Sequence, residues 1–448
     1  MSGLDRSRKQ LHLNLFLMST GHHEASWRHP KASPQHAADF GYYARMAKLA
    51  EQAKMDAVFL ADKYRLNIMT KYRVIPQLEA FTMLSALAAA TERIGLVVTA
   101  STTYNDPYHI ARKLASLDHI SGGRAAWNIV TSTGDATARN FGQARHLPHT
   151  LRYERAHEFV EAAIRLWNGW AEDALRLDQE AGIYADMSRI QAADYAGKHV
   201  SVAGPLNLPR SPQGVPVLVQ AGSSEDGRAF AARWAEVVFT AQPGIGEAAA
   251  FYADLKGRMS AYGRRPDHMK ILPGCIPFVG DTEAEAKEKE QELNELSVSE
   301  YGLTNLSALL QTDLSGCPLD GPLPYERLPA PEQVQGQQAR FRLYTELARK
   351  ENLSIRQLII RTAGGRGHFT VAGTAVQIAD TMQRWLEEQA ADGFNLMPPL
   401  LPSGLEDFVH KVIPELQNRG IYRTDYSGST LREHLGLKTE AVIPQVYS

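Results

Sequence analysis

The stretch from Ile94 to Ser132 is IGLVVTASTTYNDPYHIARKLASLDHISGGRAAWNIVTS, and it decides the fold. Its beginning, Ile94 to Thr99, and its end, Arg124 to Ser132, are largely apolar runs of strand length. Between them Pro107 opens a helix that continues to about Ile120, because a proline at a helix start lacks only an N–H that has no partner there. The stretch therefore predicts one strand–helix–strand unit.

The same alternation extends in both directions along the chain. Eight strands are predicted, at residues 11–17, 57–61, 94–99, 124–132, 215–221, 237–241, 271–279 and 394–397. Helices are predicted at residues 40–54, 78–90, 107–120, 150–167, 224–234, 247–262, 282–296 and 405–417. Continuously apolar strands are typical of a parallel sheet that is covered on both faces. Eight such units predict an α/β fold, a (β/α)8 TIM barrel, and a doubly wound open sheet is the alternative.

Two segments interrupt this alternation. Residues 168–214 follow the fourth helix, and residues 301–373 lie between the seventh and eighth strands. Both are longer than ordinary loops and rich in Gly, Pro and polar residues, so they either cap a site, build an interface or decorate the surface. We therefore expect residues 1–448 to form one barrel domain with two insertions.

Composition excludes several classes of function. The chain has 48 basic and 50 acidic residues and a net charge of −2, which gives no general attraction to nucleic acids or anionic membranes. Its two cysteines, Cys275 and Cys317, lack the spacing of a zinc site or a disulfide framework. We find no apolar signal segment and no run of 18 apolar residues, so we expect a cytoplasmic protein.

Active sites of barrels lie at the carboxyl ends of the strands, so polar residues there are candidates. They are His22, His23, Glu24, Asp62, Thr99 to Thr103, Asn128 to Ser132, His146, His149, Tyr153, Ser223 and Ser224. His149, Tyr153 and His157 share one helical face, beginning at a helix N-terminus beside Arg152. This stripe predicts either a phosphate site or ordinary packing.

Three other motifs have a structural and a functional interpretation. Ser223 and Ser224 open a helix behind Gly222, which suits either a helix cap or a phosphate. His23, Glu24 and His29 lack the spacing of a zinc-protease helix, so we expect a loop that lines the substrate, and no metal. The glycines at 244 and 246 superficially match a dinucleotide fingerprint, but no acidic residue ends the next strand. We expect a capped loop there.

Several of these stretches together identify a family. Its motifs are Phe59-Leu60-Ala61-Asp62, Thr99-Ala100-Ser101-Thr102-Thr103-Tyr104, Leu117-Asp118-His119-Ile120-Ser121-Gly122-Gly123-Arg124, Trp127-Asn128-Ile129-Val130-Thr131-Ser132, Arg152-Tyr153-Glu154-Arg155, Gln220-Ala221-Gly222-Ser223-Ser224 and Thr430-Leu431-Arg432-Glu433-His434-Leu435. From nearly end to end, the chain resembles the bacterial-luciferase-like flavin-dependent monooxygenases. Within them it resembles the nitrilotriacetate and dibenzothiophene-sulfone monooxygenase group.

This resemblance implies a (β/α)8 barrel that uses reduced FMN and O2, with the flavin supplied by a separate NAD(P)H:FMN reductase. The family's FMN-contacting positions fall on Asp62, Thr99, Asn128, His149, Tyr153, Ser223 and Ser224. Of these, we expect Tyr153, Ser223 and Ser224 to hold the phosphate, and Asp62, Thr99 and Asn128 to line the ring and the ribityl chain. His22, His23 and His368 are candidates for catalysis, through substrate contact or proton transfer.

By the same resemblance, the reaction oxygenates a small organosulfur or amino-carboxylate compound and leads to C–S or C–N cleavage. The implied partners are the small-molecule substrate, the flavin reductase and further copies of the chain in a homodimer or homotetramer. A deazaflavin-dependent oxidoreductase and a non-catalytic flavin-binding protein are the two alternative functions.

Overall fold

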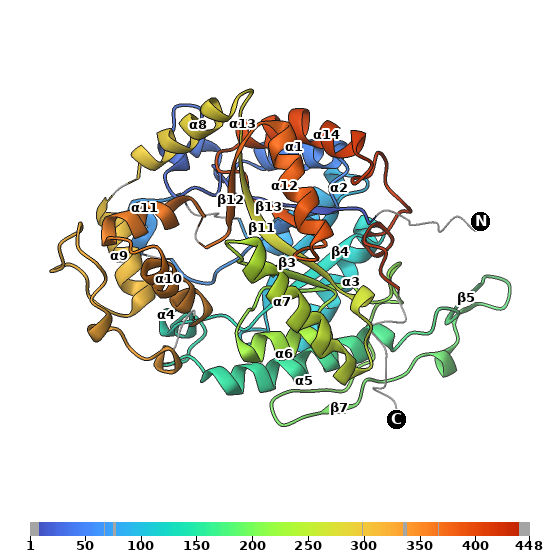
Figure 1. Cartoon of the computed structure of the whole chain (residues 1–448). Coiled ribbons are helices and arrows are strands. Elements are labelled where there is room, and N and C mark those ends of the chain that lie inside the picture. Colours follow the sequence, from blue (N-terminus) through green and yellow to red (C-terminus); the bar gives the residue numbers. More distant parts are fainter. Residues whose placement is uncertain are drawn as a thin grey trace, which may run out of the picture.

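A closed ring of parallel strands forms the centre of the molecule (Figure 1). The computed structural model describes residues 9–66, 68–74, 78–297, 299–334, 338–365 and 367–438. In spatial order the ring consists of β1 (His12–Phe16), β2 (Ala57–Leu60), β3 (Gly95–Ser101), β4 (Ala125–Val130), β9 (Val217–Gln220), β10 (Val237–Thr240), β11 (Lys270–Val279) and β13 (Gly393–Leu396). It closes because β1 pairs with both β2 and β13. The eight predicted strands and the (β/α)8 barrel are confirmed, and the open-sheet alternative is wrong.

Aromatic side chains fill the interior of the barrel. The register places Phe16 of β1 beside Phe59 of β2, and their ring centroids are 5.0 Å apart. Phe239 of β10 meets them across the barrel, with centroid distances of 5.8 and 5.5 Å. This apolar layer is a packed core rather than a pore, so polar chemistry is confined to the mouth above it.

Helices cover the outside of the ring. They are α1 (Phe40–Gln52), α2 (Ala80–Ala90), α3 (Pro107–Ser121), α5 (His149–Asn168), α6 (Glu225–Trp234), α7 (Ile245–Arg258), α8 (Glu283–Glu295) and α12 (Ala375–Glu387). All but α12 match predicted helices. The missed helix begins with a capping box between Thr374 and Gln377, a signal that the sequence carries. None of the helices in the described ranges is long and apolar enough to cross a lipid bilayer.

The last predicted helix, residues 405–417, is divided in the structure. It consists of α13 (Ser403–Asp407), a π-helical turn at Phe408–Val412 and α14 (Ile413–Asn418). Pro414 has no N–H to donate to the preceding turn, which explains why regular α-helical bonding is interrupted just before it.

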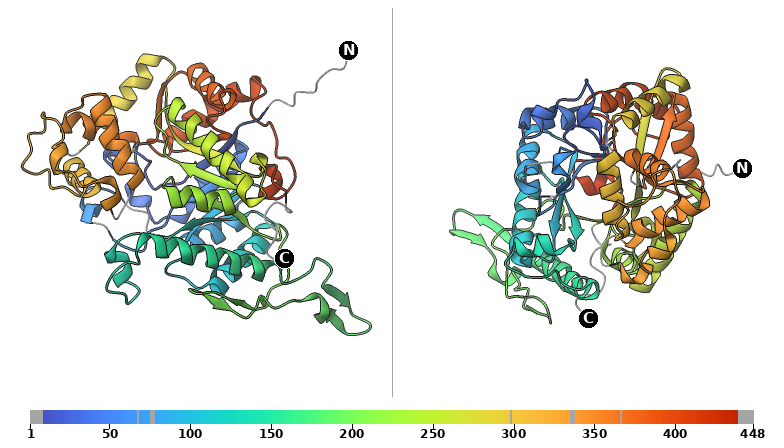
Figure 2. Two further views of the ribbon diagram at one scale, coloured as in Figure 1. Left: turned by 60° about the horizontal axis from the view of Figure 1, so that its bottom comes forward. Right: turned by 90° about the vertical axis from the view of Figure 1, so that its left-hand side faces the viewer.

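The two insertions build different structures. Residues 168–214 form two hairpins, β5 (Leu175–Asp178) with β6 (Ile183–Ala185) and β7 (Tyr195–Ala196) with β8 (Ser201–Val202). The β5–β6 hairpin projects away from the barrel in both views of Figure 2. Residues 301–373 contain α9 (Ser299–Leu310, which begins just before them), α10 (Gln338–Lys350) and α11 (Ile355–Gly365), with an apolar cluster of their own. This insertion ends in β12 (Phe369–Gly373), which pairs with β11 outside the ring.

Part of the family motif around residue 122 is structural. Gly122 and Gly123 both have positive φ, +67° and +91°, and end α3 in a conformation that side chains disfavour. Arg124 then donates to the carbonyls of Ala88 and Ile94 at 2.9 and 2.8 Å. The motif therefore joins α2, α3 and the start of β3 at the amino-terminal end of the barrel.

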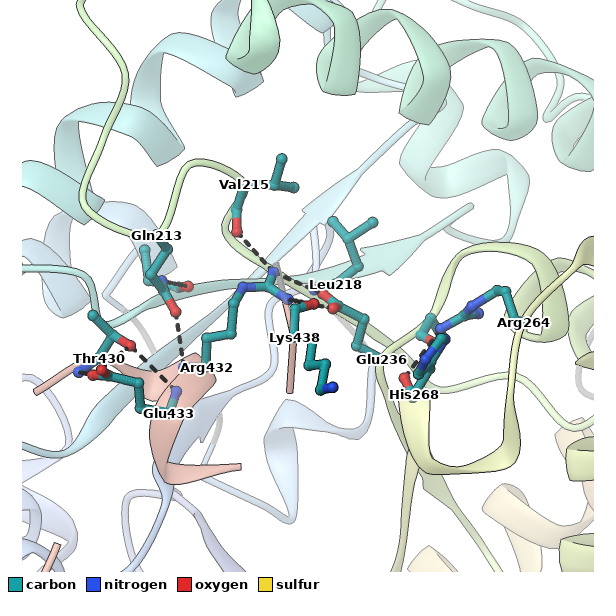
Figure 3. A network of polar contacts seen from close by, with 12 residues as sticks. Gln213, Val215, Leu218, Glu236, Arg264, His268, Thr430, Arg432, Glu433 and Lys438 are labelled. Carbon is teal, nitrogen blue, oxygen red and sulfur yellow. Dashed lines mark hydrogen bonds and ion pairs between the residues drawn. The ribbon is translucent and has the colours of Figure 1, made fainter. Parts of the chain in front are cut away.

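A buried ion pair closes the same end of the barrel near the carboxyl-terminal segment (Figure 3). The Nη1 and Nη2 atoms of Arg432 contact the Glu236 carboxylate, and Nη2 also donates to Val215 O at 2.9 Å. Glu236 Oε2 accepts the N–H of Leu218 at 3.1 Å as well. Arg432, in the short helix α15 (Leu431–His434), therefore fixes the entries to β9 and β10.

Candidate active site

Predicted cofactor residues gather at one side of the barrel mouth. Asp62 follows β2, Thr99 and Asn128 lie in β3 and β4, and Ser223 and Ser224 separate β9 from α6. These strands are consecutive in the ring, in the order β2, β3, β4, β9. Because all of them are parallel, their carboxyl ends open on the same side. The structure thus brings these five residues to one edge of the mouth.

The loop between β9 and α6 forms a cradle with Tyr153. A Cβ atom at Gly222 or at Gly227 would lie 3.2 Å from the Tyr153 hydroxyl, so both glycines permit a close approach of the ring. Ser224 caps α6 by accepting the N–H of Gly227 at 3.2 Å, and it is hydrogen-bonded to Tyr153. Ser223 lies half-buried beside it. Hydroxyl groups and the N-terminus of a helix therefore meet at one point.

His149 borders this cradle. It is the first residue of α5, and its Nδ1 lies 2.9 Å from Asp226 Oδ2 in the first turn of α6. Because a carboxylate can only accept, the Nδ1 atom carries a proton. Burial raises the pKa of Tyr153 above its usual value, with the hydrogen bond to Ser224 opposing the rise. Tyr153 is therefore a neutral donor at physiological pH.

Thr99 and Asn128 form a buried pair inside the mouth. Asn128 Nδ2 donates to Thr99 Oγ1 at 2.8 Å, and Asn128 Oδ1 has no partner among the described residues. Asp62 accepts the N–H groups of Lys63 at 2.7 Å and Ala80 at 3.3 Å. Burial raises the pKa of Asp62, against the effect of these two hydrogen bonds. An amide oxygen and a half-buried carboxyl group are thus available as acceptors for a ligand.

His22 and His368 also meet at the mouth, although the sequence separates them widely. Their ring centroids are 6.0 Å apart, and His368 stacks on Phe239 at 5.1 Å. His368 stands just before β12, so the pairing of β12 with β11 delivers it to the mouth. Gly274 of β11 makes room, because a Cβ atom there would lie 2.3 Å from His368 Nδ1. The sequence analysis missed Gly274, since only the register of β11 identifies its neighbour.

His23 is held by other contacts. Its Nδ1 accepts the N–H of Ala25 at 3.1 Å, so the proton lies on Nε2, which faces Asn294 Oδ1 at 3.2 Å. These contacts join the β1 loop to α8. Among the described ranges, no three His, Cys, Asp or Glu residues are grouped as metal ligands would be.

His157, the third member of the helical stripe, lies away from the mouth between α5 and α6. Its Nδ1 accepts the indole N–H of Trp234 at 2.8 Å, and its ring centroid lies 4.9 Å from that of Phe230. Burial, reinforced by Arg233, lowers the pKa of His157 to about 4. Of the three residues on this helical face, His149 and Tyr153 therefore lie at the mouth, whereas His157 is packed between α5 and α6.

This depressed pKa predicts a loss of stability in acid. An unfolded histidine has a pKa near 6.5, so the unfolded chain takes up the proton first as the pH falls. The penalty begins below pH 6.5 and is complete below pH 4, and we expect about 3 kcal/mol from this residue. Urea unfolding at pH 7 and pH 4.5 measures it. The variant His157→Gln, which keeps an acceptor for Trp234, should lose less stability; a loss equal to that of the wild type would contradict the assignment.

Comparison with known proteins agrees with this geometry. The family described as luciferase-like monooxygenase matches residues 16–393. The N-acetyl-S-(2-succino)cysteine monooxygenase of Bacillus subtilis (strain 168) is 48% identical over 432 residues, covering 96% of this chain and 97% of the relative. Nitrilotriacetate monooxygenase component A of Aminobacter aminovorans is 48% identical over 447 residues, with the same coverage of 96% and 97%.

A solved structure is similar over the whole fold. The crystal structure of a long-chain alkane monooxygenase is 34% identical, has a TM-score of 0.84, and the match covers 98% of each chain. The family match covers most of this chain, and the barrel is the fold that the resemblance implies. The chain therefore belongs to the luciferase-like monooxygenase family, and it is a flavin-dependent monooxygenase.

Proposed function

We propose that this protein uses reduced FMN and O2 to oxygenate a small carboxylated compound that contains sulfur or nitrogen. The two relatives at 48% identity are named for N-acetyl-S-(2-succino)cysteine and for nitrilotriacetate, which are compounds of this kind. Oxygenation of the carbon beside the heteroatom gives an unstable product that cleaves the C–S or C–N bond.

The cradle at α6 is the observation that carries the choice of FMN. Its donors are hydroxyls and free N–H groups at a helix N-terminus, which are the groups that bind a phosphate. Gly222 and Gly227 leave the space that a Cβ would fill beside Tyr153. In this proposal Tyr153, Ser223 and Ser224 hold the phosphate, with His149 beside them.

The remaining mouth residues suit the rest of the cofactor. Asp62, Thr99 and Asn128 provide acceptors for the ring and the ribityl chain. When bound, the reduced flavin supplies the electrons that activate O2, and the protein orients the flavin and excludes water. The aromatic layer of Phe16, Phe59 and Phe239 closes the mouth from below.

The histidines have separate roles in this proposal. His22 and His368 pack against each other at the mouth, where they contact the substrate or exchange a proton with it. His23, held between Ala25 and Asn294, supports the loop that carries His22. The insertion that contains α9, α10 and α11 leads into His368 and covers this part of the site.

The contact between Gly274 and His368 predicts a catalytic defect. In the variant Gly274→Ala, the new Cβ forces the imidazole ring away from β11, and a displacement of this size costs roughly tenfold to a hundredfold in kcat/KM. FMN affinity should stay unchanged, because Gly274 lies in β11 whereas the cradle lies in the loop between β9 and α6. Steady-state kinetics and FMN titration measure the two effects.

A matched control is Gly246→Ala, since a Cβ at Gly246 in α7 meets no atom within 4 Å. It should keep wild-type kinetics. Wild-type kcat/KM in Gly274→Ala would show that His368 has no role in the reaction.

We infer a separate NAD(P)H:FMN reductase as the partner, because the relative from Aminobacter aminovorans is named as component A of its system.

We also place the protein in the cytoplasm as a homodimer or homotetramer. The β5–β6 hairpin supports self-association, because it exposes the large apolar residues Leu177, Ile183 and Tyr184, and Met187 just after β6 is exposed as well. Soluble monomeric proteins rarely gather such residues on a projecting element. Light scattering of the purified protein tests the assembly.

A coupled assay tests the function. The protein is combined with FMN, NADH and a flavin reductase, and the consumption of nitrilotriacetate and N-acetyl-S-(2-succino)cysteine is followed by mass spectrometry with and without O2. We expect consumption of one compound that requires both reduced FMN and O2. Turnover without O2, or with a deazaflavin only, would support the hydride-transfer alternative. FMN binding without turnover of any carboxylated thioether or amine would support a binding protein.

A further inference from the structure

A buried guanidinium lies beside the cofactor cradle without an acidic partner. Arg152 is 3% exposed, and its Nη1 donates to Ser132 O at 2.6 Å and to Thr131 Oγ1 at 3.4 Å. Its Nε has no hydrogen-bond partner, and among the described residues no carboxylate lies within 4.0 Å of it. Burying a charge in this way is costly unless an opposite charge compensates it.

The neighbouring Arg155 shows what a structural arginine looks like in this helix. Its guanidinium donates to three backbone carbonyls, those of Thr102, His199 and Asn105, at 3.0, 2.8 and 3.2 Å. Arg152 has one such carbonyl. The difference indicates that Arg152 keeps donor capacity for a group that is not part of the chain.

Arg152 and Tyr153 are adjacent in sequence, but their side chains contact different parts of the barrel mouth. Tyr153 contacts the loop before α6, whereas Arg152 contacts the residues that follow β4. The group near Arg152 is therefore distinct from the phosphate cradle, although both lie at the mouth.

A tyrosine–histidine pair shares the Ser132 carbonyl with Arg152, and a second guanidinium lies beside Gly134, two residues further along the chain. The exposed Asp135 borders this group, and its Oδ1 accepts the backbone N–H of His146 at 2.9 Å. Tyr104 Oη and His146 Nδ1 are 2.5 Å apart, and His146 Nε2 donates to Ser132 O at 3.2 Å. Arg65 reaches over from the β2 loop, because a Cβ atom at Gly134 would lie 2.5 Å from Arg65 Nη1. Burial and then Arg152 lower the pKa of His146, against the opposing effects of the Ser132 hydrogen bond and of Asp135, so the imidazole does not supply a third positive charge at neutral pH.

We propose that Arg152 and Arg65 form an anion subsite that binds a carboxylate of the substrate beside the flavin. This inference rests on the proposed function and narrows its substrate class to compounds with at least one carboxylate placed to reach Arg152. A guanidinium suits a carboxylate because its planar fork offers two parallel donors. The subsite would also discriminate against uncharged thioethers, since these would leave the buried charge uncompensated.

The test uses tricarballylate as a carboxylate probe and its neutral triamide as a control, titrated into the protein with and without FMN. We expect the wild type to bind tricarballylate and not the triamide. The variant Arg152→Met should bind it at least tenfold more weakly, and Arg65→Met several-fold more weakly, with FMN and riboflavin affinities unchanged.

Stability provides a second readout. The substitution Arg152→Met removes an uncompensated buried charge. The Ser132 carbonyl still accepts a hydrogen bond from His146 Nε2, so we expect Tm to stay the same or rise. Arg155→Met is the matched control: it leaves three carbonyls without their donor, so Tm should fall while tricarballylate affinity stays unchanged.

The affinities of these variants show whether Arg152 binds a carboxylate of the substrate or the phosphate of FMN. If Arg152→Met weakens FMN but not riboflavin or tricarballylate, the guanidinium serves the flavin phosphate and the inference is wrong. Equal tricarballylate affinity in wild type and Arg152→Met also overturns it. Failure of the wild type to bind FMN would instead contradict the proposed function, and the titration without flavin still reports on the subsite.

Discussion

Replacing Glu236 by alanine should lower the free energy of unfolding by about 3–5 kcal/mol, the largest loss expected from a single side chain here. The substitution leaves the Arg432 guanidinium buried without its carboxylate, and it also removes the acceptor of the Leu218 N–H. Both residues are almost fully buried, so water cannot compensate. Urea denaturation at neutral pH measures the change.

Two controls separate this effect from ordinary ion pairing. Arg384 and Glu388 form an exposed i,i+4 pair, so Arg384→Ala should change stability by less than about 1 kcal/mol. The double variant Glu236→Leu with Arg432→Met removes both charges and should recover much of the loss. If Glu236→Ala were as stable as Arg384→Ala, the pair would not fix the carboxyl-terminal segment to the barrel.

The second large effect concerns the cofactor. The double variant Tyr153→Phe with Ser224→Ala should bind reduced FMN about tenfold to a hundredfold more weakly, because in the proposed site each hydroxyl donates a charge-assisted hydrogen bond to the phosphate. Ser224→Ala also removes a helix cap worth about 1 kcal/mol, so stability must be measured in parallel. Anaerobic titration followed by flavin fluorescence or absorbance gives the affinities.

Riboflavin, which lacks the phosphate, is the control ligand. Its affinity should be nearly the same in the wild type and the double variant. If Tyr153→Phe alone keeps reduced-FMN affinity within twofold, the hydroxyl does not hold the phosphate. Equal losses for FMN and riboflavin would mean that the substitutions disturb the mouth as a whole.

The barrel could be predicted because its signals are local. Each strand is a short apolar run, and each helix begins at a recognisable residue such as Pro107 or Ser224. The carboxyl end of a strand in a barrel is also the functional end, so Asp62, Thr99 and Asn128 could be placed at the mouth from the strand order alone.

The rest depends on contacts that no local pattern contains. The meeting of His22 with His368 requires β12 to pair with β11, and the room for it comes from Gly274. In the same way, the lack of an acidic partner for Arg152 can be recognised only once its neighbours in space are known. His149 and His157 share a helical face and a residue type, yet α6 places one beside Asp226 and the other beside Trp234.

The most direct test of the central claim is stopped-flow absorbance of the protein loaded with reduced FMN under nitrogen and then mixed with O2. We expect bound reduced FMN to react with O2 through a transient absorbing species distinct from reduced and oxidised FMN. This species should last longer than any seen with free flavin. Direct return of oxidised FMN at the rate of free flavin, or bound reduced flavin that does not react with O2, would contradict the account.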